Sequence, residues 1–115
     1  MKRAILLAAL CACGGSGMGP MVRNDIAAQM QSAQPALSAC YAKALAAAPV
    51  QGMITVSFAA QPSTGQFGEV VIIQDQLRNP EVAACVVATI SALKLAQPQD
   101  SRVAVSYPIH FAPNP

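Results

Sequence analysis

The amino-terminal end of the chain limits how much of it can enter a folded domain. Lys2 and Arg3 carry positive charge and precede a short apolar run that extends to residue 12. This run is too short to cross a bilayer as a helix, which needs about 20 apolar residues, but it is typical of a secretory signal peptide. The sequence therefore predicts a signal peptide over residues 1–12 and at most one small domain after it.

The end of this apolar run resembles a bacterial lipobox. Leu10 stands three residues before Cys13, and the small residue Ala12 directly precedes it, so the pattern makes Cys13 the lipidated residue after cleavage. An ordinary signal peptide cleaved near Ala12 or Gly15 is the alternative. Gly14 follows Cys13 in place of the Asp that favours retention in the inner membrane. The lipobox therefore implies a lipid anchor at the periplasmic face of the outer membrane.

The rest of the chain divides into a tether and a domain of neutral charge. Residues 13–22 are rich in glycine and predict a flexible tether, and residues 23–113 predict the domain. The formal net charge of +2 comes entirely from Lys2 and Arg3, because the other basic and acidic side chains balance. Nucleic-acid binding needs a clustered basic surface, so we expect no nucleic-acid partner.

The cysteines predict one disulfide. Cys11 belongs to the signal peptide and Cys13 takes lipid, which leaves Cys40 and Cys85 in the domain. An isolated cysteine pair in an oxidising compartment is typical of a disulfide. A structural zinc site needs four ligands, and His110 is the only further candidate, so we expect no metal.

Hydrophobic periodicity predicts the first helical region. Asn24 is a candidate N-cap for a helix from Ile26 to Ala48, which Pro35 either kinks or divides into two helices near Gln34. Steps of three and four residues mark its buried face. The residues on this face are Ile26, Met30, Ala33, Leu37, Cys40, Tyr41, Ala44 and Leu45.

The remaining segments predict three strands and a further helix. Alternating apolar residues from Gly52 to Phe58 predict a strand, the turn-rich residues 61–68 follow it, and residues 70–73 predict its hairpin partner. Asn79, Pro80 and Glu81 are typical of a helix start, here for a helix extending to about residue 94. Residues 102–111 predict the last strand, which Pro108 marks as an edge strand.

These elements predict an α+β fold with the order α-β-β-α-β. The simplest arrangement is a three-stranded antiparallel sheet in spatial order 2-1-3, with the helices on one face. Cys40 and Cys85 then lie opposite each other between the helices. The other edge of the third strand stays unpaired from Val103 to Tyr107, with Arg102 and Pro108 at its two ends.

Several short motifs resemble one family. They are Cys40-Tyr41, the strand ITVSF, the segment from Leu77 through Asn79-Pro80-Glu81-Val82 to Cys85-Val86, and the final Val103-x-Val105-x-Tyr107-Pro108-Ile109-x-Phe111. Between Ile26 and Phe111 the chain resembles the AgmX/PglI C-terminal domain family, which is related to the TonB C-terminal domain. The resemblance implies a domain that binds other envelope proteins and catalyses nothing. Unlike an energy transducer, this chain shows neither a transmembrane anchor nor a long spacer.

No combination of residues in the sequence indicates catalysis or a cofactor. His110 is the only histidine and alternates with the apolar face of the last strand, and the carboxylates are scattered singly. We therefore expect a non-enzymatic lipoprotein that docks an envelope protein or a second copy of itself. A small periplasmic ligand-binding protein or a purely structural lipoprotein is the alternative. The residues expected to bind the partner are Val103, Ala104, Val105, Ser106 and Tyr107.

Overall fold

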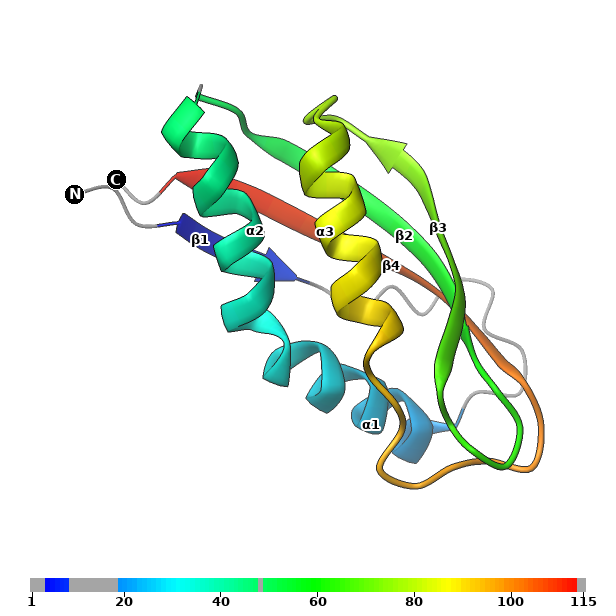
Figure 1. Cartoon of the computed structure of the whole chain (residues 1–115). Helices are drawn as coiled ribbons and strands as arrows, with labels where there is room; N and C mark the ends of the chain where they lie inside the picture. Colours follow the sequence, from blue (N-terminus) through cyan, green and yellow to red (C-terminus); the bar gives the residue numbers. More distant parts are fainter. Residues whose placement is uncertain (1–3, 9–18, 48, 114–115) are drawn as a thin grey trace.

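The computed structural model describes residues 4–8, 19–47 and 49–113. Its elements, in chain order, are β1 (Ala4–Ala8), α1 (Pro20–Ser32), α2 (Gln34–Ala47), β2 (Gly52–Ala60), β3 (Phe67–Asp75), α3 (Pro80–Ser91) and β4 (Val103–Pro113). Figure 1 shows the helices in front of a long twisted sheet. Among these described residues, no helix is both long and apolar enough to cross a membrane.

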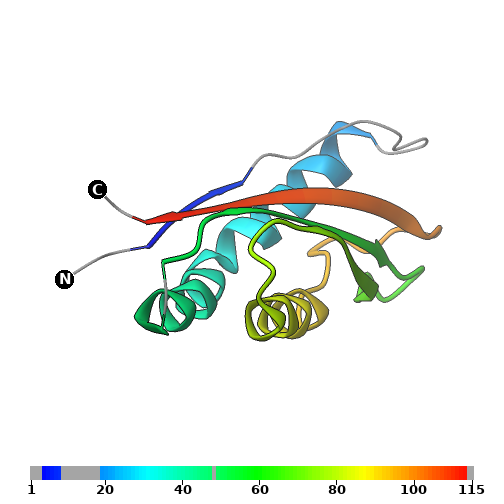
Figure 2. The ribbon, with the colours of Figure 1, turned by 90° about the horizontal axis from the view of Figure 1, so that it is seen from above.

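The sheet confirms the predicted fold class and strand order and adds one strand. Its order is β1-β4-β2-β3, with every neighbouring pair antiparallel. β2, β3 and β4 are the three predicted strands, and β2 lies between the other two as expected. Helices α2 and α3 cover the same face of the sheet (Figure 2). The additional strand β1 consists of residues 4–8, which the sequence pattern assigned to a signal peptide.

The first helical region is divided, which confirms one of the two expected alternatives. α1 ends at Ser32 and α2 begins at Gln34, so the break falls at Ala33, just before Pro35. A proline ring has no N–H to donate and clashes with the preceding turn, so the chain starts a new helix there. The N–H of Ala33 still donates to the carbonyl of Gln29 at 3.1 Å, which closes the last turn of α1.

The predicted start of this region was wrong. Gly19 is the N-cap of α1 and Pro20 its first residue, so Asn24 lies inside the helix. Proline suits the first helical position because its missing N–H has no partner to lose there. The end of the predicted tether over residues 13–22 is corrected as well, because residues 20–22 belong to α1 and Val22 is buried.

Asp25 attaches α1 to the segment that follows α3. Its carboxylate accepts hydrogen bonds from the backbone N–H of Ala96 at 3.1 Å and of Gln97 at 2.9 Å. Partial burial acts to raise the pKa of Asp25, but these two bonds and one from Gln29 outweigh it, so the pKa lies below its usual value of 3.8. The carboxylate therefore stays charged and holds the two segments together.

The start of α3 follows its sequence signature. The side-chain oxygen of Asn79 accepts from the N–H of Glu81 at 3.0 Å and of Val82 at 3.1 Å, and Pro80 is the first helical residue. This confirms the predicted N-cap. The helix ends at Ser91, somewhat earlier than expected, and Lys94 instead forms an isolated bridge with Gln66 at the hairpin turn.

The core lies between the sheet and the helices and uses the few aromatic side chains. Tyr41 of α2 packs against Phe111 of β4 with ring centroids 5.2 Å apart, and Phe58 stacks on Phe67 at 4.8 Å. The buried apolar residues form one cluster that includes α1. Each helix therefore shares a single core with the sheet.

Candidate functional site

The β3 edge of the sheet is irregular. The pairing of β2 with β3 shifts register twice, between Thr55 and Val56 and between Ser57 and Ala59. Glu69, on β3 itself, adopts a positive φ of 52° and adds a charge. Bulges and charges of this kind twist an edge strand and hinder the addition of another strand. The β3 edge is therefore a poor docking template.

The β4 edge is regular by contrast. β4 pairs with β2 without a register shift from Gly52 opposite Phe111 to Ala60 opposite Val103. Arg102, at the start of this stretch, turns its side chain away from the edge. Its guanidinium Nε donates to Glu69 on β3 at 2.8 Å, so the predicted guard at this end lies across the sheet.

The backbone bonds of Met53 establish which residues of β4 face the edge. The N–H of Gln76 donates to the Met53 carbonyl at 2.9 Å, and the N–H of Met53 donates to the Gln76 side chain at 2.9 Å. Met53 thus directs both backbone groups toward β3, and its cross-strand partner His110 must direct both of its own away from β2. By the alternation of the ladder, the edge-facing residues of β4 are Ala104, Ser106, Pro108, His110 and Ala112.

Pro108 divides this edge into two parts. It has no N–H, and at an edge-facing position it costs the β2–β4 ladder no hydrogen bond. On one side of Pro108, residues 109–113 pair with β1. On the other side, no strand among the described residues pairs with residues 103–107 along the edge.

The five residues expected to bind a partner all lie in this second part of the edge, with two different roles. Val105 and Tyr107 are buried, each 5% exposed, and belong to the core cluster. Ala104 and Ser106 are exposed and present their N–H and C=O groups to the edge. Pro108 was the signal in the sequence that could have revealed this alternation, because its missing N–H must point away from β2. Val103 lies at the start of the strand, partly buried.

The predicted disulfide is present. Cys40 of α2 is bonded to Cys85 of α3, with their Cα atoms 5.8 Å apart. The hydroxyl of Thr89 donates to the Cys85 carbonyl at 2.8 Å beside the bridge. The bond therefore joins the two helices that cover the sheet. The predicted lipidation residue, Cys13, lies outside the described residues.

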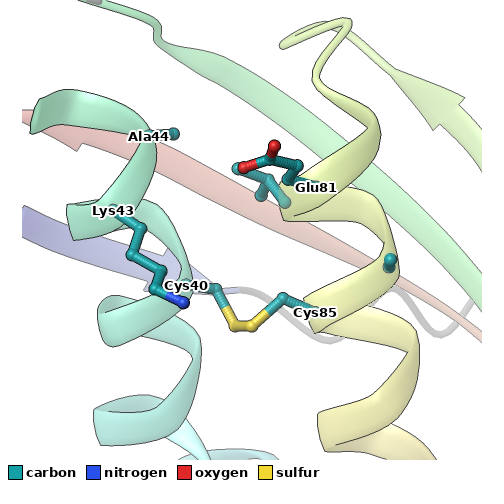
Figure 3. A pocket seen from close by; sticks show the side chains of 7 residues that line it. Cys40, Lys43, Ala44, Glu81 and Cys85 are labelled. Atoms are coloured by element: carbon teal, nitrogen blue, oxygen red, sulfur yellow. A yellow bond between two sulfur atoms is a disulfide. The ribbon is translucent and has the colours of Figure 1, made fainter. Parts of the chain in front are cut away.

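An open cavity of about 360 Å³ lies between α2 and α3, over the disulfide. Figure 3 shows Glu81 projecting from α3 toward α2, and the Lys43 side chain extending from α2 toward the bridge. Small-molecule sites need several convergent polar groups on an apolar lining, and this cavity offers only two charged side chains. The other lining residues are Cys40, Ala44, Val82, Ala84 and Cys85.

Three candidate side chains remain, those of His110, Tyr41 and Tyr107, and their surroundings are those of structural residues. His110 is exposed on the sheet face away from the core. Tyr41 is fully buried and donates its hydroxyl to the Val50 carbonyl, and burial raises the pKa of Tyr41. Burial also raises the pKa of Tyr107. Within the described part of the chain, no three His, Cys, Asp or Glu side chains gather as metal ligands.

Comparison with protein-family models, with curated proteins and with solved structures finds no match to this chain.

Proposed function

We propose that this chain is a non-enzymatic lipoprotein of the bacterial cell envelope, lipidated at Cys13 and held at the periplasmic face of the outer membrane. Its domain, similar to the TonB C-terminal domain, binds another envelope protein or a second copy of itself through the β4 edge. The observation that carries the interaction is the contrast between the two edges of the sheet. β4 is regular over its whole pairing with β2, whereas β3 is bulged twice.

The edge from Val103 to Tyr107 has the properties of a strand-accepting surface. Ala104 and Ser106 supply N–H donors and C=O acceptors, and neither carries a charge that would repel an added strand. An extended peptide that adds here gains backbone hydrogen bonds, and its alternate side chains supply selectivity. Arg102 bonds to Glu69 across the sheet and does not cover these groups.

The membrane anchor rests on the sequence around Cys13. Each buried CH₂ of an acyl chain contributes about 0.8 kcal/mol of membrane affinity, which a neutral domain cannot replace. Cys13→Ala should abolish labelling by radioactive palmitate and release the protein from the membrane fraction. A Cys13→Ala protein that remains in that fraction as firmly as the unchanged one contradicts the anchor.

The binding edge is tested with a proline at an edge-facing position. Ser106→Pro removes an N–H that points away from β2, so the sheet keeps its internal hydrogen bonds. Ser106→Ala is the matched control, because it removes the same hydroxyl and keeps the N–H. The partner is first captured by cross-linking in intact envelopes and identified, and its affinity for each variant is then measured.

Ser106→Pro should weaken the partner complex at least tenfold, which is about 1.4 kcal/mol, whereas Ser106→Ala should not. Circular dichroism and retention of the Cys40–Cys85 bond establish that both variants are folded. A folded Ser106→Pro protein that binds the partner as tightly as the control would exclude this edge. Val105→Pro is unsuitable, because the N–H of Val105 points toward β2 and its loss weakens the sheet itself.

A further inference from the structure

We propose that residues 4–8 act as an intramolecular fourth strand that occupies the β4 edge at residues 109–113, and that their removal with the leader opens this part of the edge to a strand from another protein. The first half of this proposal concerns only the full chain. The second half rests on the proposed function, because it takes residues 1–12 as a cleaved signal peptide.

The register of β1 on β4 assigns a role to each residue pair. β1 runs antiparallel to β4 from Ala4 opposite Pro113 to Ala8 opposite Ile109. His110 and Ala112 direct their backbone groups to this edge, so their partners Leu7 and Ile5 form the hydrogen-bonded pairs. Leu6 opposite Phe111 is then a non-hydrogen-bonded pair, whose Cα atoms approach to about 4.5 Å.

The part of the edge that β1 covers borders the core. Phe111 is only 1% exposed and packs against Tyr41 of α2. The backbone of β1 lies close to α2 as well as to β4. Loss of β1 therefore leaves the backbone N–H and C=O groups of His110 and Ala112 without strand partners, next to the buried Phe111.

This arrangement defines the chemistry of the replacement strand. It runs antiparallel to β4, as residues 4–8 do, and it resembles the segment that it replaces (AILLA) in being apolar and uncharged. The residue opposite Phe111 shares a sheet face with Phe111, because directly opposed residues in an antiparallel pair do so. An apolar residue is therefore required at that position. The leader and an external partner compete for the same edge.

The first half is tested on the unlipidated full chain by NMR. Leu7→Pro removes an N–H that points to β4, whereas Leu6→Pro makes the same replacement where the N–H points away. Amide exchange at His110 and Ala112 should be at least tenfold faster in Leu7→Pro than in Leu6→Pro. Equal exchange rates in the two variants overturn the pairing of residues 4–8 with β4 within the same chain.

A second measurement needs no substitution. The close approach of Leu6 and Phe111 predicts a strong Hα–Hα nuclear Overhauser effect between them in the unchanged full chain. Absence of this signal, with the cross-strand Hα signals between β2 and β4 present, also overturns the pairing of residues 4–8 with β4. Both outcomes are independent of whether the protein is lipidated in cells.

The second half is tested on the processed protein purified from cells. His110 and Ala112 should exchange rapidly, while Ile109 and Phe111, which face β2, stay protected. A synthetic peptide of residues 2–10 should slow exchange at His110 and Ala112 at least tenfold. A peptide with proline for Leu7 is the matched control and should have no such effect.

Protection of His110 and Ala112 without peptide, or no response to the peptide, overturns the second half. Failure of the proposed function gives a different result. In that case the protein takes no palmitate in cells, or the folded Ser106→Pro protein binds the captured partner as tightly as Ser106→Ala, while the full-chain measurements remain as expected.

Discussion

The largest single covalent contribution to stability should come from the disulfide between α2 and α3. Cys40 and Cys85 close a loop with a sequence separation of 45 residues. In the chain-entropy model, a loop of this length destabilises the unfolded chain by about 4 kcal/mol. The Cys40→Ala, Cys85→Ala double variant should therefore lose about 4 kcal/mol of unfolding free energy. This is a large share of the 5–15 kcal/mol, roughly, that natural domains possess.

The loss is measured by urea unfolding and by thermal melting of the unlipidated chain. At about 4–8 °C per kcal/mol for a domain of this size, the melting temperature should fall by about 20 °C. Alanine is the suitable replacement, because Cys40 is only 4% exposed and a serine hydroxyl would have to be buried there. The control is a reducing agent, which should destabilise the unchanged protein by a similar amount and leave the double variant unaffected.

Two results would refute this reasoning. A fall in melting temperature of less than about 5 °C, with an unchanged urea m-value, shows that the loop contributes little entropy to the unfolded chain. A reduced protein that is as stable as the oxidised one shows the same without any substitution. A lower m-value in the double variant instead indicates that its unfolded state is more compact than that of the unchanged protein.

Three further predictions concern single contacts. Asn79→Ala removes the α3 cap and should cost about 1 kcal/mol in urea unfolding, whereas Asn79→Ser should recover most of it. Gly65 has a φ of 72°, so Gly65→Ala should lower the free energy of unfolding by about 1–2 kcal/mol. The pKa of Asp25 is lowered from 3.8, so its stabilising contribution is complete above that value and is lost as the pH falls through the folded-state pKa. Amide exchange at Gln97, corrected for the intrinsic pH dependence, should therefore rise in acid, and Asp25→Asn should abolish this pH dependence.

Local sequence signals were sufficient wherever a short segment determines its own structure. The alternation at Ile54, Val56 and Phe58 predicted β2, because each of these residues is buried on one face. Asn79 predicted the start of α3, because its side chain caps the helix from within the same segment. The Cys40–Cys85 bond followed from a count of cysteines together with the two helix faces.

The errors arise where two local signals compete or where partners are distant in sequence. Asn24 is a reasonable N-cap, but Gly19 followed by Pro20 starts α1 earlier, and burial of Val22 extends the helix into the predicted tether. Pairing of residues 4–8 with 109–113 was not predicted, because backbone pairing leaves no periodic trace in a short apolar run. A short apolar run of this kind is compatible both with a signal peptide and with a strand.

Pro108 connects the fold with the proposed interactions. Its position in the middle of β4 is tolerated only because its nitrogen faces the edge, and the same fact fixes which residues on either side are free to bind. A strand that follows the whole edge must leave one carbonyl without a donor opposite Pro108. Two short segments avoid that loss, and β1, which ends opposite Ile109, is one such segment. The proline therefore divides the β4 edge into two parts, residues 103–107 and residues 109–113, and the two proposed interactions each use one of them.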